Sequence, residues 1–380
     1  MTGTGPARNS APTAPAPTTG AMAPPTGRTL RVATRRSALA LAQSTAVGEQ
    51  LAALTGRTLE LVEVTTTGDV DRSPLAQIGG TGVFVAAVRE AVVDGRADVA
   101  VHSLKDLPTT GDPRLELAAV PAREDPRDVL VTREGTGLAG LRPGARVGTG
   151  SPRRRAQLAA ARPDLEVIDI RGNVDTRLSR VLGGGDRAAQ PDLDAVVLAA
   201  AGLVRLGRTD VITEHLDPEV CMPAPGQGAL AIEVRTGSEV AAEVRALDDP
   251  DTRVAVTAER SLLSALEAGC SAPVGALGVV GGAAVDGSAP PTSPAGASTV
   301  HLRAVLATGD GTLLRQSASG PVDRADQVGR DLARGLLADP RARQVATDPA
   351  AGRSQAGPAA PDPPTTTTSP TTIDRGRPIR

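Results

Sequence analysis

The chain has 380 residues, more than one hydrophobic core usually serves, so we expect two or three domains. Its formal net charge of -2 argues against a nucleic-acid-binding protein that works through bulk positive charge. No apolar run reaches the roughly 18 residues of a membrane span, which argues against a transmembrane protein.

The two cysteines, Cys221 and Cys270, can form one disulfide at most. Residues 1–28 contain no apolar stretch of the kind found in a signal peptide, so we expect a cytoplasmic protein with free thiols. These first residues lack acids and are rich in Ala, Pro and Thr. A transit peptide has a similar composition, but we favour a disordered extension.

Several residue types are nearly missing from the chain. It contains 40 arginines but one lysine, Lys105, one phenylalanine, Phe84, and two asparagines, Asn9 and Asn173. Tyrosine and tryptophan do not occur. A rare residue in so biased a sequence either serves a specific need or survives by chance, and a position inside a motif favours the specific need.

Strands alternate with helices along the first two thirds of the chain, after the predicted disordered tail. This order predicts two α/β domains with parallel sheets covered on both faces. Helical spacing predicts helices at Ser37–Leu54 and Val83–Val93. Alternation and β-branched residues predict strands at Thr29–Ala33, Leu59–Val64, Asp98–Val101, Ala145–Thr149, Leu165–Ile170, Ala195–Leu198 and Ala229–Val234.

The last third predicts a smaller α+β domain with an antiparallel sheet. Ala258, Leu262 and Leu266 lie on one face of a predicted helix, Thr252–Ala268, and Val328, Leu332 and Leu336 mark a final helix. Between the helices, residues 300–306 alternate strictly. Gly309-Asp310-Gly311 is typical of a hairpin turn, and Thr312–Ser317 is the expected return strand.

We therefore divide the chain into three domains. The expected parts are a first α/β domain at 29–122 and 223–246, a second α/β domain at 123–222, an α+β domain at 247–345 with an inserted loop at 281–298, and a disordered tail at 346–380. The strand at Ala229–Val234 follows the second domain, and we expect it to return to the first sheet. Two crossings between these domains would form a hinge.

Arginines crowd three predicted strand-to-helix turns, each of which ends in a natural helix cap: Ser37, Ser151 or Asn173. Cations at a helix N-terminus are unfavourable by themselves, but a bound anion reverses this, because backbone N–H groups, the helix dipole and guanidinium donors then all favour it. Such turns line the crevice of open α/β sheets. We predict an anion site there; a solvated basic face is the alternative. The arginines are Arg35, Arg36, Arg153, Arg154, Arg155, Arg171 and Arg177.

The only lysine stands beside a carboxylate at the end of a predicted buried strand, in His102-Ser103-Leu104-Lys105-Asp106. Asp106 can stabilise a developing cation and shuttle protons if desolvation and neighbouring cations set its pKa near that task. A lysine–aspartate surface pair is the alternative, and His102 is equally well explained as a core histidine. No Cys/His cluster has metal-ligand spacing, so we expect no metal.

Cys270 follows the predicted helix in Glu267-Ala268-Gly269-Cys270. An exposed thiol there can be a nucleophile or an attachment point, and a small buried residue is the alternative. That alternative is the better explanation for Cys221. The glycine run at 79–82 precedes a predicted helix and is either a flexible lid over the cleft or an ordinary loop.

Taken in order, these segments resemble the porphobilinogen deaminase, or hydroxymethylbilane synthase, family over roughly residues 29–345. One segment would carry little weight, but the ordered set is highly specific, and Phe84, Lys105 and Asn173 lie inside it. The matching segments are Ala33–Ala40, Gly79–Phe84, Ala97–Asp106, Arg123–Asp128, Gly148–Arg154, Arg171–Val174, Ala200–Leu203, Pro225–Ala229 and Gly269–Cys270.

The resemblance implies a three-domain fold whose first two domains are similar to bacterial periplasmic binding proteins. It implies a transferase of porphyrin and haem biosynthesis that joins four porphobilinogen molecules into hydroxymethylbilane and releases four ammonia. It implies a dipyrromethane cofactor bound through a thioether to Cys270, with Asp106 as the catalytic carboxylate. We expect a cytoplasmic monomer that binds neither nucleic acid nor membrane.

The resemblance also implies which residues surround the cofactor and substrate. Their acetate and propionate groups are expected on Arg35, Ser37, Lys105, Arg153, Arg154, Arg171, Arg177 and Arg205. Gly79, Gly80 and Phe84 are expected in the lid. The chain departs from the family at Gln77 and Thr81, where lysines often stand, so the lid carries less positive charge; Arg155 is a candidate to compensate. Two alternatives stay open: a non-catalytic hinged anion-binding protein, and a degenerate deaminase that folds without turning over.

Overall fold

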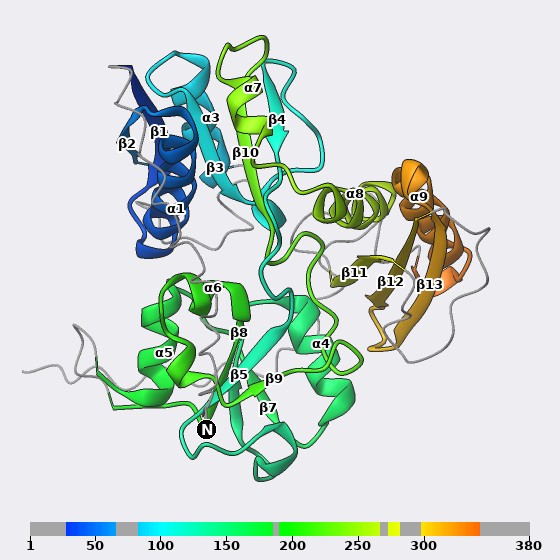
Figure 1. Ribbon diagram of the computed structural model, residues 1–380. Coiled ribbons are helices and arrows are strands. Elements are labelled where there is room, and N and C mark those ends of the chain that lie inside the picture. Colours follow the sequence, from blue (N-terminus) through cyan, green and yellow to red (C-terminus); the bar gives the residue numbers. More distant parts are fainter. Residues whose placement is uncertain (1–27, 66–82, 185–189, 267–272, 282–297, 343–380) are drawn as a thin grey trace, which may run out of the picture.

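Three separate sheets organise the chain, and each forms the centre of its own lobe in Figure 1. The computed structural model describes residues 28–65, 83–184, 190–266, 273–281 and 298–342. The first lobe (blue, cyan and one lime strand) lies above the second lobe (green), and the third lobe (olive to orange) lies beside their junction. The predicted fold class, two α/β units and a small α+β unit, is confirmed.

The first lobe is a five-stranded sheet between helices. Its elements are β1 (Thr29–Arg35), α1 (Ala38–Thr55), β2 (Thr58–Val64), α3 (Val83–Val93), β3 (Val99–Ser103), the 3-10 turn η1 (Leu104–Asp106), β4 (Leu115–Ala119), β10 (Leu230–Arg235) and α7 (Ala241–Arg245). The strand order is β2-β1-β3-β10-β4. Helix α1 packs on one face through Val47 and Leu51, and α3 packs on the other through Val88 and Val92.

The second lobe repeats this plan. Its elements are β5 (Asp128–Thr132), η2 (Leu138–Gly140), β6 (Arg146–Gly148), α4 (Pro152–Ala161), β7 (Glu166–Ile168), α5 (Val174–Leu182), β8 (Ala195–Ala199), α6 (Ala200–Arg205), η3 (Thr209–Val211) and β9 (Glu214–His215). The strand order is β7-β6-β8-β5-β9. Helix α4 packs on one face through Leu158, whereas α5 and α6 pack on the other through Leu178 and Leu203.

Both of these sheets are mixed, so the prediction of parallel sheets is wrong in part. Strands β1, β2 and β3 are parallel, as are β6, β7 and β8. Strand β10 runs antiparallel to β3 and β4, and β5 runs antiparallel to β8. Strands β5 and β10 each follow a crossing between the lobes, so no crossover helix fixes their direction. As expected, β10 returns the chain to the first sheet.

The third lobe is an antiparallel sheet covered by two helices. Its elements are α8 (Pro250–Ala265), β11 (Val274–Val280), β12 (Thr299–Ala307), β13 (Leu313–Pro321), η4 (Val322–Arg324) and α9 (Ala325–Leu337), with strand order β11-β12-β13. The predicted hairpin between β12 and β13 is confirmed. So are both predicted apolar helix faces, because their residues share one core with Val300 and Leu302.

Four strands were not predicted from the sequence: β4, β5, β11 and the two-residue β9. All five residues of β5 and the first five of β11 are buried, so neither strand shows the alternation that identifies a half-buried strand. Helix α8 starts earlier than predicted because Asp249 accepts a hydrogen bond from the Thr252 backbone and Pro250 fits the first turn. No helix in the described part of the chain is long and apolar enough to cross a membrane.

The buried carboxylate of Glu259 on α8 holds the three lobes together. The first two lobes are joined by two crossings, residues 120–127 and 216–229. Glu259 accepts two hydrogen bonds from Arg123 (2.6 and 3.1 Å) in the first crossing, one from Gly226 N (2.6 Å) in the second, and one from Gly278 N (2.8 Å) in β11. Its side chain is fully buried, so these four donors replace water around the charge.

The two crossings also touch each other directly. Glu124 N donates to Gly228 O at 3.3 Å. Gly228 has a φ of 88°, and a Cβ there would collide with Glu124 O. Only glycine therefore fits where the two crossing segments meet.

Glu259→Gln should destabilise the folded chain by about 3–5 kcal/mol, because it leaves the Arg123 guanidinium buried without a counter-charge. Glu239→Gln is the matched control: Glu239 pairs with Arg28 but its side chain is 83% exposed, so the change should stay within about 0.5 kcal/mol. Urea unfolding followed by circular dichroism measures both. Equal midpoints for the two variants would contradict the proposed role of Glu259.

Candidate functional site

The three predicted helix caps are confirmed. Ser37 Oγ accepts from Ala40 N at the start of α1, Ser151 Oγ from Arg154 N at the start of α4, and Asn173 Oδ1 from Thr176 N at the start of α5. Each of these helices comes directly after a strand: α1 follows β1, α4 follows β6, and α5 follows β7. The turn η1, with Lys105 and Asp106, follows β3, which is parallel to β1. The arginine-bearing turns and η1 therefore lie at the carboxyl edges of their sheets.

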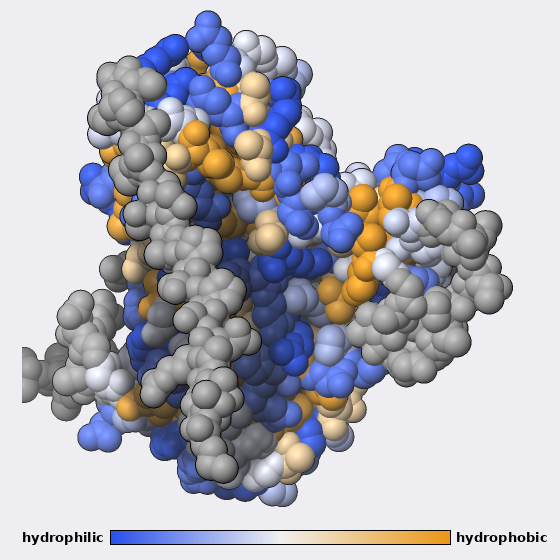
Figure 2. All heavy atoms as spheres, viewed as in Figure 1, coloured by the Kyte–Doolittle hydropathy of each residue, from blue (hydrophilic) through white to orange (hydrophobic). Residues whose placement is uncertain are grey.

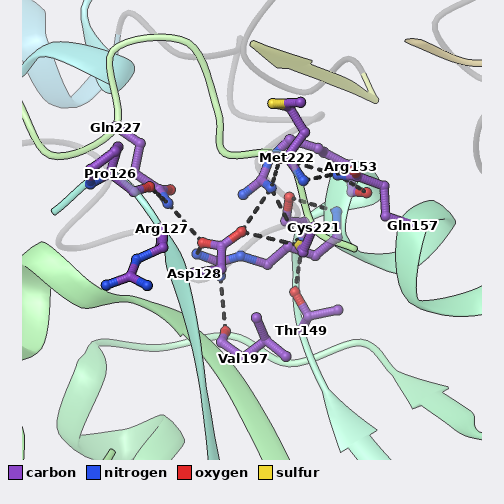
Figure 3. A network of polar contacts seen from close by, with 12 residues as sticks. Pro126, Arg127, Asp128, Thr149, Arg153, Gln157, Val197, Cys221, Met222 and Gln227 are labelled. Carbon is purple, nitrogen blue, oxygen red and sulfur yellow. Dashed lines mark hydrogen bonds and ion pairs between the residues drawn. The ribbon is translucent and has the colours of Figure 1, made fainter. Parts of the chain in front are cut away.

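Asp128, at the start of β5, is the centre of a buried polar network (Figure 3). Arg153 Nη1 donates to its Oδ2 at 2.7 Å, Arg154 Nη2 to its Oδ1 at 2.7 Å, and Gln227 Nε2 to the same Oδ1 at 2.8 Å. Burial would raise the pKa of Asp128, but the two guanidinium groups hold it well below its usual range. Asp128 is therefore a permanent anion between two permanent cations.

Arg153 and Arg154, predicted to hold ligand carboxylates, are 4% and 5% exposed and bind Asp128. Arg153 also donates to Met222 O, and Arg154 Nη1 donates to Val197 O at 2.9 Å. Both arginines project from the first turn of α4. One carboxylate balances two guanidinium groups, so the pair keeps one positive charge beyond the carboxylate it binds.

Lys105 lies close enough to Arg153 and Arg154 to interact with their charge. Its Nζ lies 3.3 Å from Gln227 Oε1, and the amide of Gln227 donates to Asp128 and to Pro126 O (2.7 Å), so Gln227 links the lysine to the buried network. Desolvation by the surrounding protein lowers the pKa of Lys105 to about 8; Asp106 and Asp128 oppose this, while Arg154 and Arg153 add to it. The lysine side chain is partly exposed, so a ligand can reach it.

Three further predicted arginines differ in their surroundings. Arg177 is partly buried, donates to Gly172 O at 2.9 Å, and has a pKa lowered by desolvation and by the charges of Arg154 and Arg171. Arg171 is exposed, 3.9 Å from Asp169. Arg205 Nη2 donates to Gly228 O in the second crossing at 2.6 Å, and desolvation lowers its pKa. The structure brings Arg177 into electrostatic contact with Asp106 and Arg154, and Arg205 into contact with the crossing.

Asp106 ends the turn η1 and is exposed. Within the described ranges no hydrogen bond or ion pair occupies its carboxylate, although Lys105 and Arg177 are close enough to interact electrostatically. Arg35 is the last residue of β1, two positions before the cap Ser37. In Figure 2 hydrophilic residues gather in the hollow between the first and second lobes.

Some predicted site residues lie outside the described residues: Cys270, Gly79 and Gly80, as do Gln77 and Thr81. Phe84 belongs to the first turn of α3. Cys221 is fully buried, as predicted, with its Sγ 3.3 Å from Asp128 Oδ2, and burial raises the pKa of its thiol to about 12. Among the residues that the structure describes, no group of His, Cys, Asp and Glu could hold a metal ion.

Sequence reasoning missed Asp128 and Gln227 as parts of the site. A signal existed for Asp128: it is a carboxylate at the head of a strand whose five residues are all buried, and such a charge requires a partner. Arg155, the candidate to compensate for the missing lid lysines, donates to Val167 O of its own lobe at 2.6 Å. Its guanidinium therefore binds the backbone of β7, in the second sheet.

The arrangement can bind an anion that carries several charges. Lys105, Arg154, Arg171 and Arg177 influence one another, and the pKa values of Lys105 and Arg177 are lowered partly by neighbouring cations. Such mutual repulsion is relieved when carboxylates or phosphates enter. Asp106 and Asp169 are exposed carboxylates near these cations. Asp169 pairs with Arg171 at 3.9 Å, whereas no described residue holds Asp106 by a hydrogen bond or ion pair, so a cationic group of the same ligand would find its partner at Asp106.

Two family models match the chain. Residues 30–243 match "Porphobilinogen deaminase, dipyromethane cofactor binding domain", and residues 254–338 match "Porphobilinogen deaminase, C-terminal domain". Porphobilinogen deaminase 1 of Streptomyces coelicolor is 52% identical over 323 residues, which cover 82% of this chain and 96% of that protein. Porphobilinogen deaminase of Micrococcus luteus is 52% identical over 328 residues, 79% of this chain and 84% of that protein. A TRAP periplasmic solute-binding protein from Desulfovibrio salexigens matches in structure at 11% identity with a TM-score of 0.33, covering 58% of this chain and 72% of that one.

Lys105 should titrate near pH 8 in an empty site, instead of near its ordinary value of 10.5. It is charged below that pH and loses its charge above it, so anion affinity should fall as the pH rises through 8. Because it is the only lysine, acylation by a neutral amine-reactive ester, followed by peptide mass spectrometry, reports on it specifically. The Cys270→Ser variant keeps the site free of any thiol-linked group, and Lys105→Arg identifies the background from the chain's amino terminus. Half-maximal reactivity near pH 10.5 would refute the desolvation argument.

Proposed function

Because the chain belongs to the porphobilinogen deaminase family, we propose that it joins four porphobilinogen molecules head to tail into hydroxymethylbilane, with the loss of four ammonia. The reaction is a transfer in tetrapyrrole biosynthesis. Each porphobilinogen carries an acetate and a propionate group, so every addition brings two more carboxylates into the site. The enzyme must therefore hold a negative charge that grows with the chain.

The observation that carries this proposal is the excess of positive charge around Asp106. Arg153 and Arg154 share one carboxylate, and the pKa values of Lys105 and Arg177 are lowered chiefly by desolvation and further by neighbouring arginines. An anion-binding protein without catalysis would need these cations. It would not need an exposed carboxylate in their midst, and Asp106 supplies one.

The site residues fit a dipyrromethane cofactor, whose two rings together bring four carboxylates. We propose that Cys270 bears it through a thioether and that its carboxylates are held by Lys105, Arg177 and Arg205 directly, and by Arg153 and Arg154 through their field or after rearrangement. When bound, the cofactor supplies the free pyrrole carbon to which the first substrate is joined. Arg35, Ser37 and Arg171, at the turns that begin α1 and α5, are proposed for the incoming substrate.

Asp106 is the proposed catalytic residue. Loss of ammonia from porphobilinogen leaves positive charge spread over the pyrrole ring and its nitrogen, and the Asp106 carboxylate stabilises that charge. The same carboxylate can hold the pyrrole N–H and accept a proton as the new carbon–carbon bond forms. Lys105 and Arg177 interact electrostatically with Asp106, so two cationic side chains lie near the carboxylate that is proposed to stabilise the cation.

We further propose the domain division given by the sequence, with residues 29–122 and 223–246, 123–222 and 247–345 as the three domains. The two crossings then act as a hinge between the first two. Gly79, Gly80 and Phe84 are proposed to belong to a lid over the substrate. The enzyme is proposed to work as a cytoplasmic monomer on a small-molecule substrate.

Intact-mass analysis of purified protein tests the tether. The mass should exceed that of the bare chain by two linked pyrrole units, and the excess should be absent in Cys270→Ser. Cys221→Ser is the matched control; it should keep the excess, because Cys221 is fully buried. A bare chain that still consumes porphobilinogen would refute the tether, and a bare chain without turnover would favour the non-catalytic alternatives.

Asp106→Asn should reduce porphobilinogen consumption by about 10²–10⁴-fold, because the amide keeps size and polarity but loses the charge that stabilises the cation. Asp175→Asn is a suitable control, since Asp175 is an exposed carboxylate in the first turn of α5. Both variants should unfold at the same temperature as the parent. Near-normal turnover by Asp106→Asn would remove Asp106 from the mechanism.

A further inference from the structure

Arg260, on the third-lobe helix α8, binds the backbone on both sides of Lys105–Asp106. Its Nη1 donates to Leu107 O at 2.9 Å and lies 3.3 Å from Leu104 O, and its Nη2 donates to Pro108 O at 2.7 Å. We propose that Arg260 is a positioning residue that fixes the Asp106 carboxylate relative to the growing pyrrole chain. This inference rests on the proposed function, because it gives Arg260 a task only if Asp106 performs the chemistry.

Asp106 depends on its backbone for its position. Its carboxylate is exposed and no described residue holds it by a hydrogen bond or ion pair, so the side chain goes where the turn η1 goes. The turn is closed by the bond from Leu107 N to Leu104 O (3.1 Å) and is anchored below by Leu104 N to Ala229 O (3.0 Å). Arg260 binds both carbonyls that bracket the turn, so one planar guanidinium sets its orientation.

The same helix leads to the proposed tether. Helix α8 ends at Ala265, and Cys270 follows five residues later in the sequence. A rigid helix therefore connects the segment that would carry the pyrrole chain with the turn that carries Asp106. Four additions must present four different rings to one carboxylate, so that carboxylate has to keep its place while the chain moves past it. A misplacement of about 1 Å at a reacting group can cost on the order of 100-fold in rate.

Arg253 provides a matched control on the same helix. It stands seven residues earlier, on the same face of α8, and it also fastens the helix to the first lobe: Nε donates to Asp248 Oδ2 at 2.7 Å, and Nη2 lies 3.2 Å from Ala118 O and 3.4 Å from Leu117 O. Its targets belong to β4 and its neighbourhood, away from η1. If Arg260 only docked α8, loss of either arginine should have the same effect.

The experiment compares Arg260→Met with Arg253→Met in the full chain. We expect Arg260→Met to keep the mass increase on Cys270 and to lose between about 10- and 100-fold in kcat with little change in KM. Arg253→Met should keep its kcat, and both variants should show similar unfolding temperatures. Arg260→Lys, which keeps a cation at the same place, should recover part of the loss and is the second variant if Arg260→Met does not fold.

A double-mutant cycle with Asp106→Glu separates positioning from general damage. Glutamate already displaces the carboxylate by one methylene, so adding Arg260→Met to it should cost much less than in the parent. Additive losses, or equal losses from the two arginine variants, would overturn the inference and leave the proposed function intact. Parent protein with neither the mass increase nor turnover would refute the proposed function and this inference together.

Discussion

The fully buried carboxylate of Glu259 is the contact on which the arrangement of the lobes depends. It binds Arg123 in one crossing, Gly226 in the other and Gly278 in the third sheet. A single side chain therefore holds both crossings and the third sheet in place relative to one another. The next residue of the same helix, Arg260, donates hydrogen bonds to the backbone just after the turn that carries Asp106. Adjacent residues of α8 thus contact both the junction of the lobes and the turn that carries Asp106.

Around that junction, charge is distributed unequally. Asp128 accepts a hydrogen bond from each of Arg153 and Arg154 but cancels only half of their charge. Arginines do not release a proton at ordinary pH, so this charge persists. The pKa of Lys105 is lowered to about 8, chiefly by desolvation and in part by Arg154 and Arg153. In the proposed function, the carboxylates of a bound ligand would supply the missing counter-charge.

Local features of the fold were predictable from the sequence, and distant pairings were not. The caps Ser37, Ser151 and Asn173 follow from chemistry within three residues, and all three predictions are confirmed. The ordered motifs gave the family, and Lys105 with Asp106 stands at the predicted strand end. The partner of Asp128 is different: Arg153 is 25 residues away and Gln227 is 99. Neither pairing can be predicted from the spacing of residues along the sequence. The antiparallel direction of β5 and β10 was not predictable either, because it depends on the path of the two crossings.

The contact between Gly228 and Glu124 has a consequence for how the lobes can move. The two crossing segments meet backbone to backbone, and no side chain at residue 228 would fit between them. In the hinge proposed above, this contact would lie at the pivot. Asp128 and Gln227, joined by a hydrogen bond of 2.8 Å, stand four residues after Glu124 and one residue before Gly228. A rotation there would displace this buried pair little, so the proposed hinge could turn without separating its charges.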